Sequence, residues 1–114
     1  MSVRACAAVQ GGICGFVTEI TAVSEDEQQV SFAIASPCAN IQGLAAALPD
    51  QIDAFQEIGS GYTGVIWAAA QRTLRGCCSG CVVPVALFKA MQVAARIALP
   101  AESVITLTLS EDNT

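Results

Sequence analysis

The sequence contains no histidine among its 114 residues. Histidine is the commonest general base near neutral pH and the commonest nitrogen ligand for metals, so acid–base and metal chemistry is left to thiols and carboxylates. Aromatic residues are also scarce, at 5%, and charged residues make up only 13%. This composition leaves enzymatic activity open and favours a binding role over a catalytic one.

Positive charge is scarce as well. Five Lys and Arg residues stand against ten Asp and Glu residues, which gives a formal net charge of −5. Nucleic-acid binding requires clustered Lys and Arg to neutralise phosphates, and the sequence has no such cluster. We therefore expect neither a nucleic acid nor an anionic membrane as a partner.

Long hydrophobic runs are lacking. The best run, residues 81–100, is interrupted by Lys89, Gln92 and Arg96, whereas a spanning helix needs about 20 mostly apolar residues. The apolar stretch that follows Arg4 is too short for the hydrophobic region of a signal peptide. We expect a cytoplasmic protein, and in the cytoplasm thiols are normally kept reduced.

Hydrophobic residues as a class are abundant, at 54%. A chain of this length and composition can bury a hydrophobic core without stabilising disulfides or metals, so we expect one domain over residues 1–114. Apolar and small residues alternate from 29 to 36, which is typical of a half-buried strand. Strands are also expected at 2–9, 15–23 and 103–110, the last with Ile105, Leu107 and Leu109 facing inward.

The period becomes helical after Pro37. Helices are expected at 41–48, after Asp50, after Thr63, and at 84–98. Asn40, Asp50 and Thr63 are the expected N-caps, and Pro84 suits the first turn of the last helix. The order of strands, helices and a closing strand predicts an α+β fold, in which a small antiparallel sheet carries helices on one face. That sheet would combine a hairpin with the C-terminal strand.

Six cysteines are the most informative feature of the sequence. Cys6 lies within a strand and is expected to be a small buried residue. The other cysteines fall at element boundaries: Cys14 after a glycine turn, Cys38 before a helix, and Cys77, Cys78 and Cys81 in the loop that opens the last helix. Unpaired N–H groups at a helix N-terminus lower the pKa of a thiol there, so Cys38 and Cys81 are expected to be reactive or ligating.

The spacing Cys78-x-x-Cys81 suits two ligands of one metal or a dithiol redox pair. Together with Cys14 and Cys38 it predicts a metal site of four thiolates, in which Cys77 is a substitute ligand. Thiolate ligands without histidine favour a soft metal, so the expected cofactor is zinc or an iron–sulfur cluster.

Two alternatives stay open at this point. In the first, the thiols of residues 77–81 form a disulfide, or Cys38 carries a persulfide, and the protein is a redox or sulfur-relay protein. In the second, the cysteines are incidental and the chain is a structural or interaction domain.

The segments GICGF, SPCANIQGLAAAL and CCSGCVVPVALFKAMQVAA are similar in order to those of the U-type iron–sulfur cluster assembly scaffolds, over roughly residues 11–98. The resemblance implies the fold of those scaffolds, with Cys14, Cys38 and Cys81 matching their cysteines and Cys78 in the place of a histidine. It implies a cluster carrier, scaffold or sensor, with partners in iron–sulfur or sulfur metabolism and a homodimer as one state. The chain departs from the scaffolds in having no acidic residue just after Cys14 and no chaperone-recognition stretch before the last cysteine.

A closer likeness is to a small uncharacterised family of anaerobic bacteria and archaea. Its members resemble this chain in a GICGF-like stretch, a Ser-x-Cys before a helix, and a Cys-Pro-Val-Pro-like turn. Here that turn reads CVVP, with Val82 in the place of the first proline. This resemblance implies a fold and a cysteine site but no function.

Overall fold

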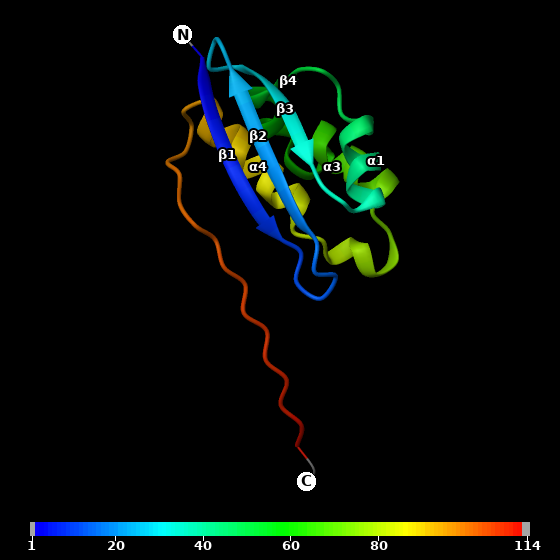
Figure 1. The fold of residues 1–114 in the computed structure, drawn as a ribbon. Helices are drawn as coiled ribbons and strands as arrows, with labels where there is room; N and C mark the ends of the chain where they lie inside the picture. Colours follow the sequence, from blue (N-terminus) through cyan, green and yellow to red (C-terminus); the bar gives the residue numbers. More distant parts are fainter. Residues whose placement is uncertain (1, 113–114) are drawn as a thin grey trace.

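The computed structural model describes residues 2–112 and contains, within that range, a four-stranded antiparallel sheet of order β1-β2-β3-β4 (Figure 1). The strands are β1 (Val3–Gln10), β2 (Val17–Ser24), β3 (Gln29–Ala35) and the short β4 (Ile52–Asp53). Neighbouring strands pair antiparallel throughout. The α+β prediction is confirmed, and so are the expected strands near 2–9, 15–23 and 29–36.

Side chains along β1 alternate between the two faces of the sheet. Ala5 and Val9 are buried on the inner face, while Arg4 and Cys6 are exposed on the outer one. The expectation that Cys6 is buried is therefore wrong, because the alternation places it opposite Thr21 on the outer face.

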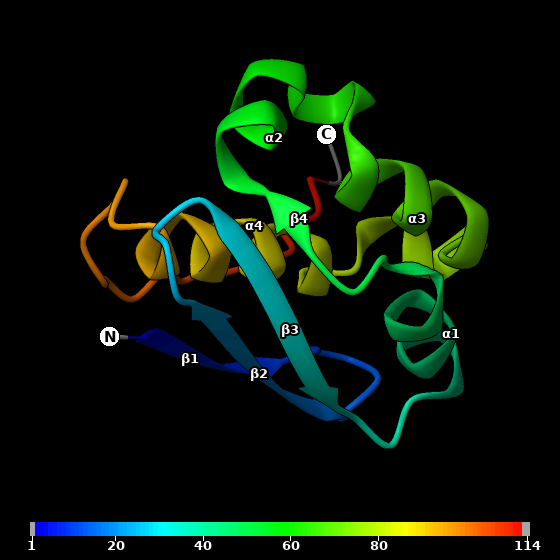
Figure 2. The same ribbon diagram turned by 90° about the horizontal axis from the view of Figure 1, so that it is seen from above.

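The helices pack on the inner face of the sheet (Figure 2). They are α1 (Ala39–Ala47), α2 (Ala54–Ser60), α3 (Val65–Thr73) and α4 (Val83–Ala94), with the 3-10 turns η1 (Gly61–Thr63) and η2 (Gly76–Gly80). α4 packs against β1 and β2, and α1 packs against β3 and α3. Strands and helices share one hydrophobic core, whose largest fully buried apolar side chains are Ile20, Leu44, Ile66, Leu87, Met91 and Val30.

The expected helix N-caps need correction. Cys38 is the N-cap of α1, so Asn40 lies inside the first turn. α2 begins after Asp53 instead of Asp50, because the Asp53 carboxylate accepts two N–H groups of the first turn. α3 begins after Gly64 and not after Thr63, which ends η1.

A buried carboxylate replaces the expected cap of α3. Glu57, 3% exposed, accepts hydrogen bonds from the backbone N–H of Val65 at 2.7 Å and of Ile66 at 3.2 Å. A Cβ at Gly64 would lie 2.8 Å from both carboxylate oxygens of Glu57, so only glycine fits there. α4 carries Pro84 in its first turn as predicted, and it ends at Ala94 instead of residue 98.

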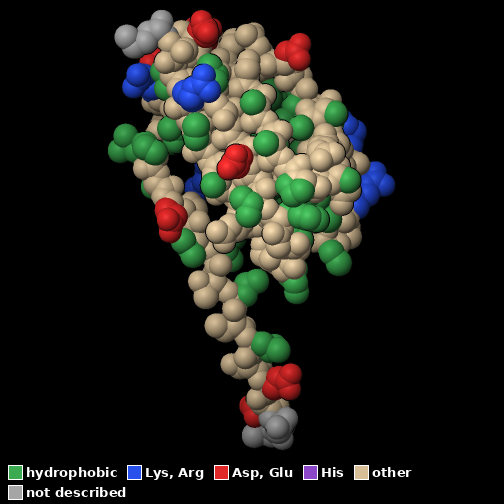
Figure 3. Space-filling view, viewed as in Figure 1, with side chains coloured by type: hydrophobic (Ala, Val, Ile, Leu, Met, Phe, Trp, Pro, Cys, Tyr) green, Lys and Arg blue, Asp and Glu red, His purple; other side chains and the backbone are tan. Residues whose placement is uncertain are grey.

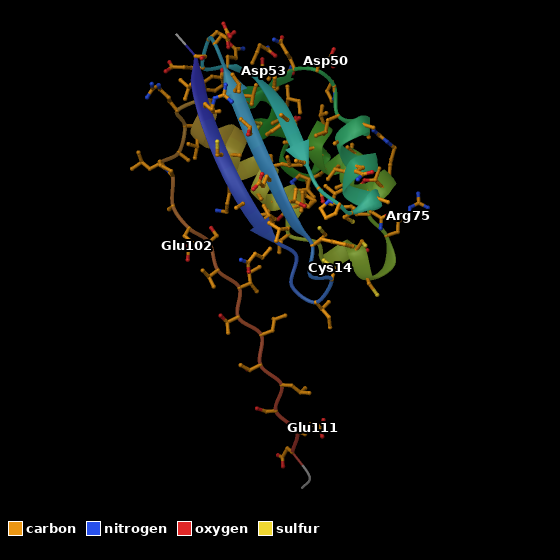
Figure 4. All side chains as sticks on the ribbon, in the orientation of Figure 1. Cys14, Asp50, Asp53, Arg75, Glu102 and Glu111 are labelled. Atoms are coloured by element: carbon orange, nitrogen blue, oxygen red, sulfur yellow. The ribbon has the colours of Figure 1, made fainter. Side chains whose placement is uncertain are left out.

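The C-terminal strand of the predicted sheet is absent from the described part of the chain. Residues 101–112 instead form an extended, exposed tail that runs away from the body (Figures 1 and 4). The alternating pattern of 103–110 is suited to pairing but does not specify a partner, and here the tail pairs with none of the described strands. The sheet is completed instead by β1 and β4.

Among the described residues, one helical stretch, Gly76–Ala94, is long and apolar enough to cross a bilayer by length and composition. Its α4 portion contributes Val83, Leu87 and Met91 to the core. Of its most apolar window, 33% is buried inside the fold.

Candidate functional site

Thiols from separate segments of the chain gather at one end of the sheet. Cys14 lies in the loop between β1 and β2, Cys38 at the start of α1, Cys78 in η2, and Cys81 just before α4. Figure 4 shows Cys14 at the end of the sheet where η2 lies, far from Asp50 and Asp53. All the cysteines are free thiols in the described chain.

The loop that carries Cys14 is shaped by glycines. Gly12 and Gly15 have φ of 85° and 74°, a region that favours glycine, and the Gly11 N–H bonds the Phe16 carbonyl at 2.9 Å. The Cys14 Sγ packs so closely on Gly11 that a Cβ there would lie 2.4 Å from the sulfur. The missing side chain of Gly11 thus sets the position of the exposed Cys14 thiol.

Cys38 is positioned by Ser36. The Ser36 Oγ accepts hydrogen bonds from the Cys38 N–H at 3.2 Å and from the Thr18 hydroxyl at 2.8 Å. The Ser36 carbonyl accepts a further bond from the Gln42 amide at 2.9 Å. These contacts tie the start of α1 to the beginning of β2, where Thr18 is 2% exposed.

Cys78 is contacted from α1. The side-chain amide of Asn40 donates to the Cys78 Sγ at 3.3 Å, which places η2 against the first turn of α1. At the end of η2, the Cys81 N–H donates to the Cys78 carbonyl at 3.1 Å. Cys78 and Cys81 are half-buried against the core, whereas the neighbouring Cys77 is exposed.

Cys81 lies close enough to the other three thiols to interact with each of them electrostatically. Burial raises the pKa of the Cys81 thiol above its usual 9.0, and charge repulsion from Cys78, Cys14 and Cys38 raises it further. The Val83 N–H, at the start of α4, donates to Cys81 and acts in the opposite direction. The expectation that the start of α4 lowers the pKa of Cys81 is therefore wrong, because burial of the thiol outweighs the Val83 N–H. An unliganded Cys81 favours its protonated form, and a cation among these sulfurs would replace that proton.

The structure brings Cys14, Cys38, Cys78 and Cys81 to one end of the fold, and Cys77, next to Cys78 in η2, is exposed. Cys6 lies apart on the outer face of β1. Among residues 2–112, no three Cys, Asp or Glu side chains are placed as ligands of one metal ion. Cys14, Cys38 and Cys78 thus lie within electrostatic reach of Cys81, and the role of these thiols as metal ligands stays a prediction.

The sequence interpretation missed the residues that position the thiols. Asn40 was assigned to a cap, and Ser36, Thr18 and Gly11 were given no role at the site. The Ser-x-Cys spacing is a recognisable signal for Ser36, since a serine hydroxyl commonly accepts the N–H two residues later. The Asn40 contact depends on how α1 meets η2 and has no local signal.

Comparison with protein-family models finds one match, over residues 5–107, to a family of unknown function (DUF6951). No curated protein and no solved structure matches the chain. The resemblance to the U-type scaffolds therefore rests on the arrangement of the cysteines alone. The expectation of a small uncharacterised family is confirmed: the chain belongs to DUF6951.

Proposed function

We propose that this protein binds zinc or an iron–sulfur cluster through Cys14, Cys38, Cys78 and Cys81. The observation that carries the proposal is the gathering of these thiols from three separate segments at one end of the sheet: the β1–β2 loop, the start of α1, and the η2 loop before α4. Cysteines that merely fill the core have no reason to meet in this way.

The donor set favours a soft metal. The candidate ligands among residues 2–112 at this end are thiols, and thiolates prefer zinc or iron–sulfur clusters over magnesium or calcium. The sequence has no histidine to replace a thiolate. A site of four thiolates holds its metal tightly, so stable retention or sensing fits it better than rapid transfer of a labile cluster.

Backbone and amide donors support bound thiolates. Cys38 lies at the N-terminus of α1, Cys81 accepts the first N–H of α4, and the Asn40 amide donates to Cys78. Helix N-termini and N–H···S bonds stabilise negative charge on sulfur and tune a bound metal.

Binding requires the sulfurs to move closer together. Ligands of a zinc ion lie about 2.3 Å from it. Cys14 sits in a glycine-rich loop and Cys78 in a short 3-10 turn, so both have neighbours that allow small shifts. In this proposal, metal binding brings the loop of Cys14 closer to η2. The protein would work in the cytoplasm, with partners in iron–sulfur or sulfur metabolism.

Thiol redox chemistry is the second candidate. It is favoured by the exposure of Cys77 beside the half-buried Cys78 and Cys81, because a redox pair needs one accessible attacking thiol and one resolving thiol. In that case Cys14 and Cys38 are dispensable.

The decisive experiment is anaerobic purification followed by metal analysis and visible spectroscopy. The chain is titrated with zinc, and separately reconstituted with ferrous iron and sulfide. Serine variants of Cys14, Cys38, Cys78 and Cys81 are compared with Cys6→Ser, a matched control on the outer face of β1.

We expect each of the four substitutions to weaken binding by at least about 100-fold, since loss of a ligand exceeds the 10–100-fold cost of losing an outer partner. Cys6→Ser should bind normally. Binding that survives in all four variants would overturn the proposal. Absence of metal, together with a disulfide formed only through residues 77–81, would favour the redox candidate.

A further inference from the structure

The C-terminal tail exposes a row of large apolar side chains. Val104, Ile105, Leu107 and Leu109 are 71%, 70%, 90% and 85% exposed. The tail extends from the body and carries hydrophobic side chains along its length (Figure 3). It accounts for the elongated extents of the chain, 59 × 27 × 26 Å. Such a row is unfavourable in water and is typical of a surface that binds another protein segment.

The sheet has a matching free edge. Within the described residues, β1 pairs with β2 on one side and with no strand on the other. β1 is eight residues long, and so is the alternating segment 103–110. A long edge strand offers unpaired N–H and C=O groups that accept an added strand.

We propose that residues 103–110 of one copy of this chain add to β1 of a second copy, and that the exchange is reciprocal. The occupant is a second copy because the free strand and the free edge are both present on one chain. When a two-fold axis relates the two copies, each tail pairs with the β1 edge of the other copy. Neither a free tail nor a free β1 edge is then left to bind further molecules.

Strand direction favours exchange over pairing within one chain. β1 and the tail run the same way in Figure 1, so a tail folding onto its own β1 would pair in parallel. In a second copy related by a two-fold axis perpendicular to the tail, β1 runs in the direction opposite to the tail. Its addition continues the antiparallel pairing of the whole sheet.

The two faces of the added strand suit the sheet. Pairing Leu107 with Ala7 places Leu109 beside Ala5 and Ile105 beside Val9 on the helix-covered face, where small β1 side chains leave room for larger ones. Thr106 and Thr108 then lie on the outer face with Ala8 and Cys6. The family match, residues 5–107, takes in most of β1 and the tail as far as Leu107.

The first test measures the mass of the full chain by sedimentation under reducing conditions, with chelator present so that metal plays no part. We expect a dimer of twice 11.7 kDa. Leu107→Lys should raise the dissociation constant by more than about 100-fold, because an unpaired ammonium would be buried. Thr106→Lys, on the outer face, is the matched control and should remain dimeric. A monomeric wild type, or a dimer unaffected by Leu107→Lys, overturns the proposal.

The second test uses the exposed Cys6 thiol as a probe. In the stated register Cys6 lies opposite position 108, so Thr108→Cys should give a disulfide-linked dimer on mild oxidation in the presence of chelator. The peptides are identified by mass spectrometry in a mixture of isotopically labelled and unlabelled chains. Leu107→Cys, on the other face, should not link to Cys6, and Cys6→Ser should abolish the link.

A register shifted by two residues would move the link to Thr106→Cys or Ser110→Cys and would still support exchange. A link formed only within one chain, or none from any of the three outer positions, overturns it. Because both tests are run without metal, their outcome is independent of the cysteine-site proposal.

Discussion

The helices begin in two different ways at the two ends of the molecule. At α2 and α3, carboxylates occupy the N-termini: Asp53 accepts two N–H groups at 3.0 Å each, and Glu57 accepts two at 2.7 and 3.2 Å. At α1 and α4, the N-cap residues Cys38 and Val82 make no side-chain cap bond, and thiols stand at or beside the helix start. Figure 4 shows Asp53 and Cys14 at opposite ends of the fold.

The carboxylate-capped helix starts contribute to the stability of the fold, whereas the helix starts beside thiols carry the candidate chemistry. An oxygen cap satisfies N–H groups at the start of a helix and stabilises the fold. A thiol is a weak acceptor, so the thiol end gains less stability from capping and keeps N–H groups that can support sulfur anions. We therefore expect substitutions at the carboxylate end to affect unfolding, and those at the thiol end to affect metal binding.

The largest expected effect is at Glu57. Glu57→Ala should lower the free energy of unfolding by about 2–4 kcal/mol, because a buried N–H group, that of Ile66, and a part-buried one, that of Val65, lose their acceptor. Chemical denaturation measures this loss, and metal binding per folded chain should be unchanged. Glu57→Gln, which keeps one acceptor oxygen, should lose less.

Cys81→Ala provides the matched contrast at the thiol end. In the metal-free protein it should cost much less stability than Glu57→Ala, while abolishing tight metal binding. Equal destabilisation by the two substitutions would remove the proposed division between the ends.

The second effect is at Gly11. Gly11→Ala should weaken metal binding by about 10–100-fold, the range typical of a disturbed supporting residue, because the added Cβ would lie 2.4 Å from the Cys14 sulfur. Gly59→Ala in α2, where nothing lies within 4 Å, is the control and should bind normally. Equal affinities in a zinc competition assay would show that the position of Cys14 does not matter for binding.

A smaller effect is expected at Asn40. Asn40→Ala removes the amide that donates to Cys78 at 3.3 Å, and should weaken metal binding by about tenfold. Ala46→Ser, an exposed change on the same helix, is the control. An unchanged affinity would show that the Asn40 contact belongs only to the metal-free state.

Much of the fold could be predicted because strand and helix periods differ. The alternation of Val30, Phe32 and Ile34 and the punctuation by Pro37, Pro49 and Pro84 located β3, α1 and α4. The alternation of residues 103–110 was equally clear, yet this segment forms no strand and lies outside the sheet. Periodicity reports that a segment is suited to pairing, whereas its partner depends on the path of the chain after α4.

The site was predictable to the extent that it depends on local position. Cys38 and Cys81 stand at helix starts, as their neighbours Pro37 and Pro84 indicate. The contacts that hold the site, from Ser36 to Cys38 and from Asn40 to Cys78, depend on how the β3–α1 loop and η2 pack, which no short sequence pattern encodes.

The smallest expected effects are in the pH dependence of stability, and they have opposite signs at the two ends. Hydrogen bonds hold the pKa of Asp26, chiefly through the Gln29 N–H, and of Asp53, chiefly through the Gln28 amide, below their usual 3.8. The unfolded chain therefore binds more protons than the folded one in acid. The resulting stability is fully present above pH 3.8 and is lost as the pH falls through the folded pKa values.

At the thiol end, burial and then repulsion by the neighbouring thiols raise the pKa of Cys81 above 9.0. The folded chain keeps this proton after the unfolded chain has lost it, so the metal-free protein should lose stability as the pH rises above 9.0. Bound metal reverses the trend, because thiols release protons on binding and metal-dependent stabilisation grows from about pH 5 to 8. Urea midpoints across pH 3–10 measure both arms. Cys81→Ala should flatten only the alkaline arm and Asp53→Asn only the acid one, and an alkaline arm unchanged in Cys81→Ala would show that the thiol end does not control it.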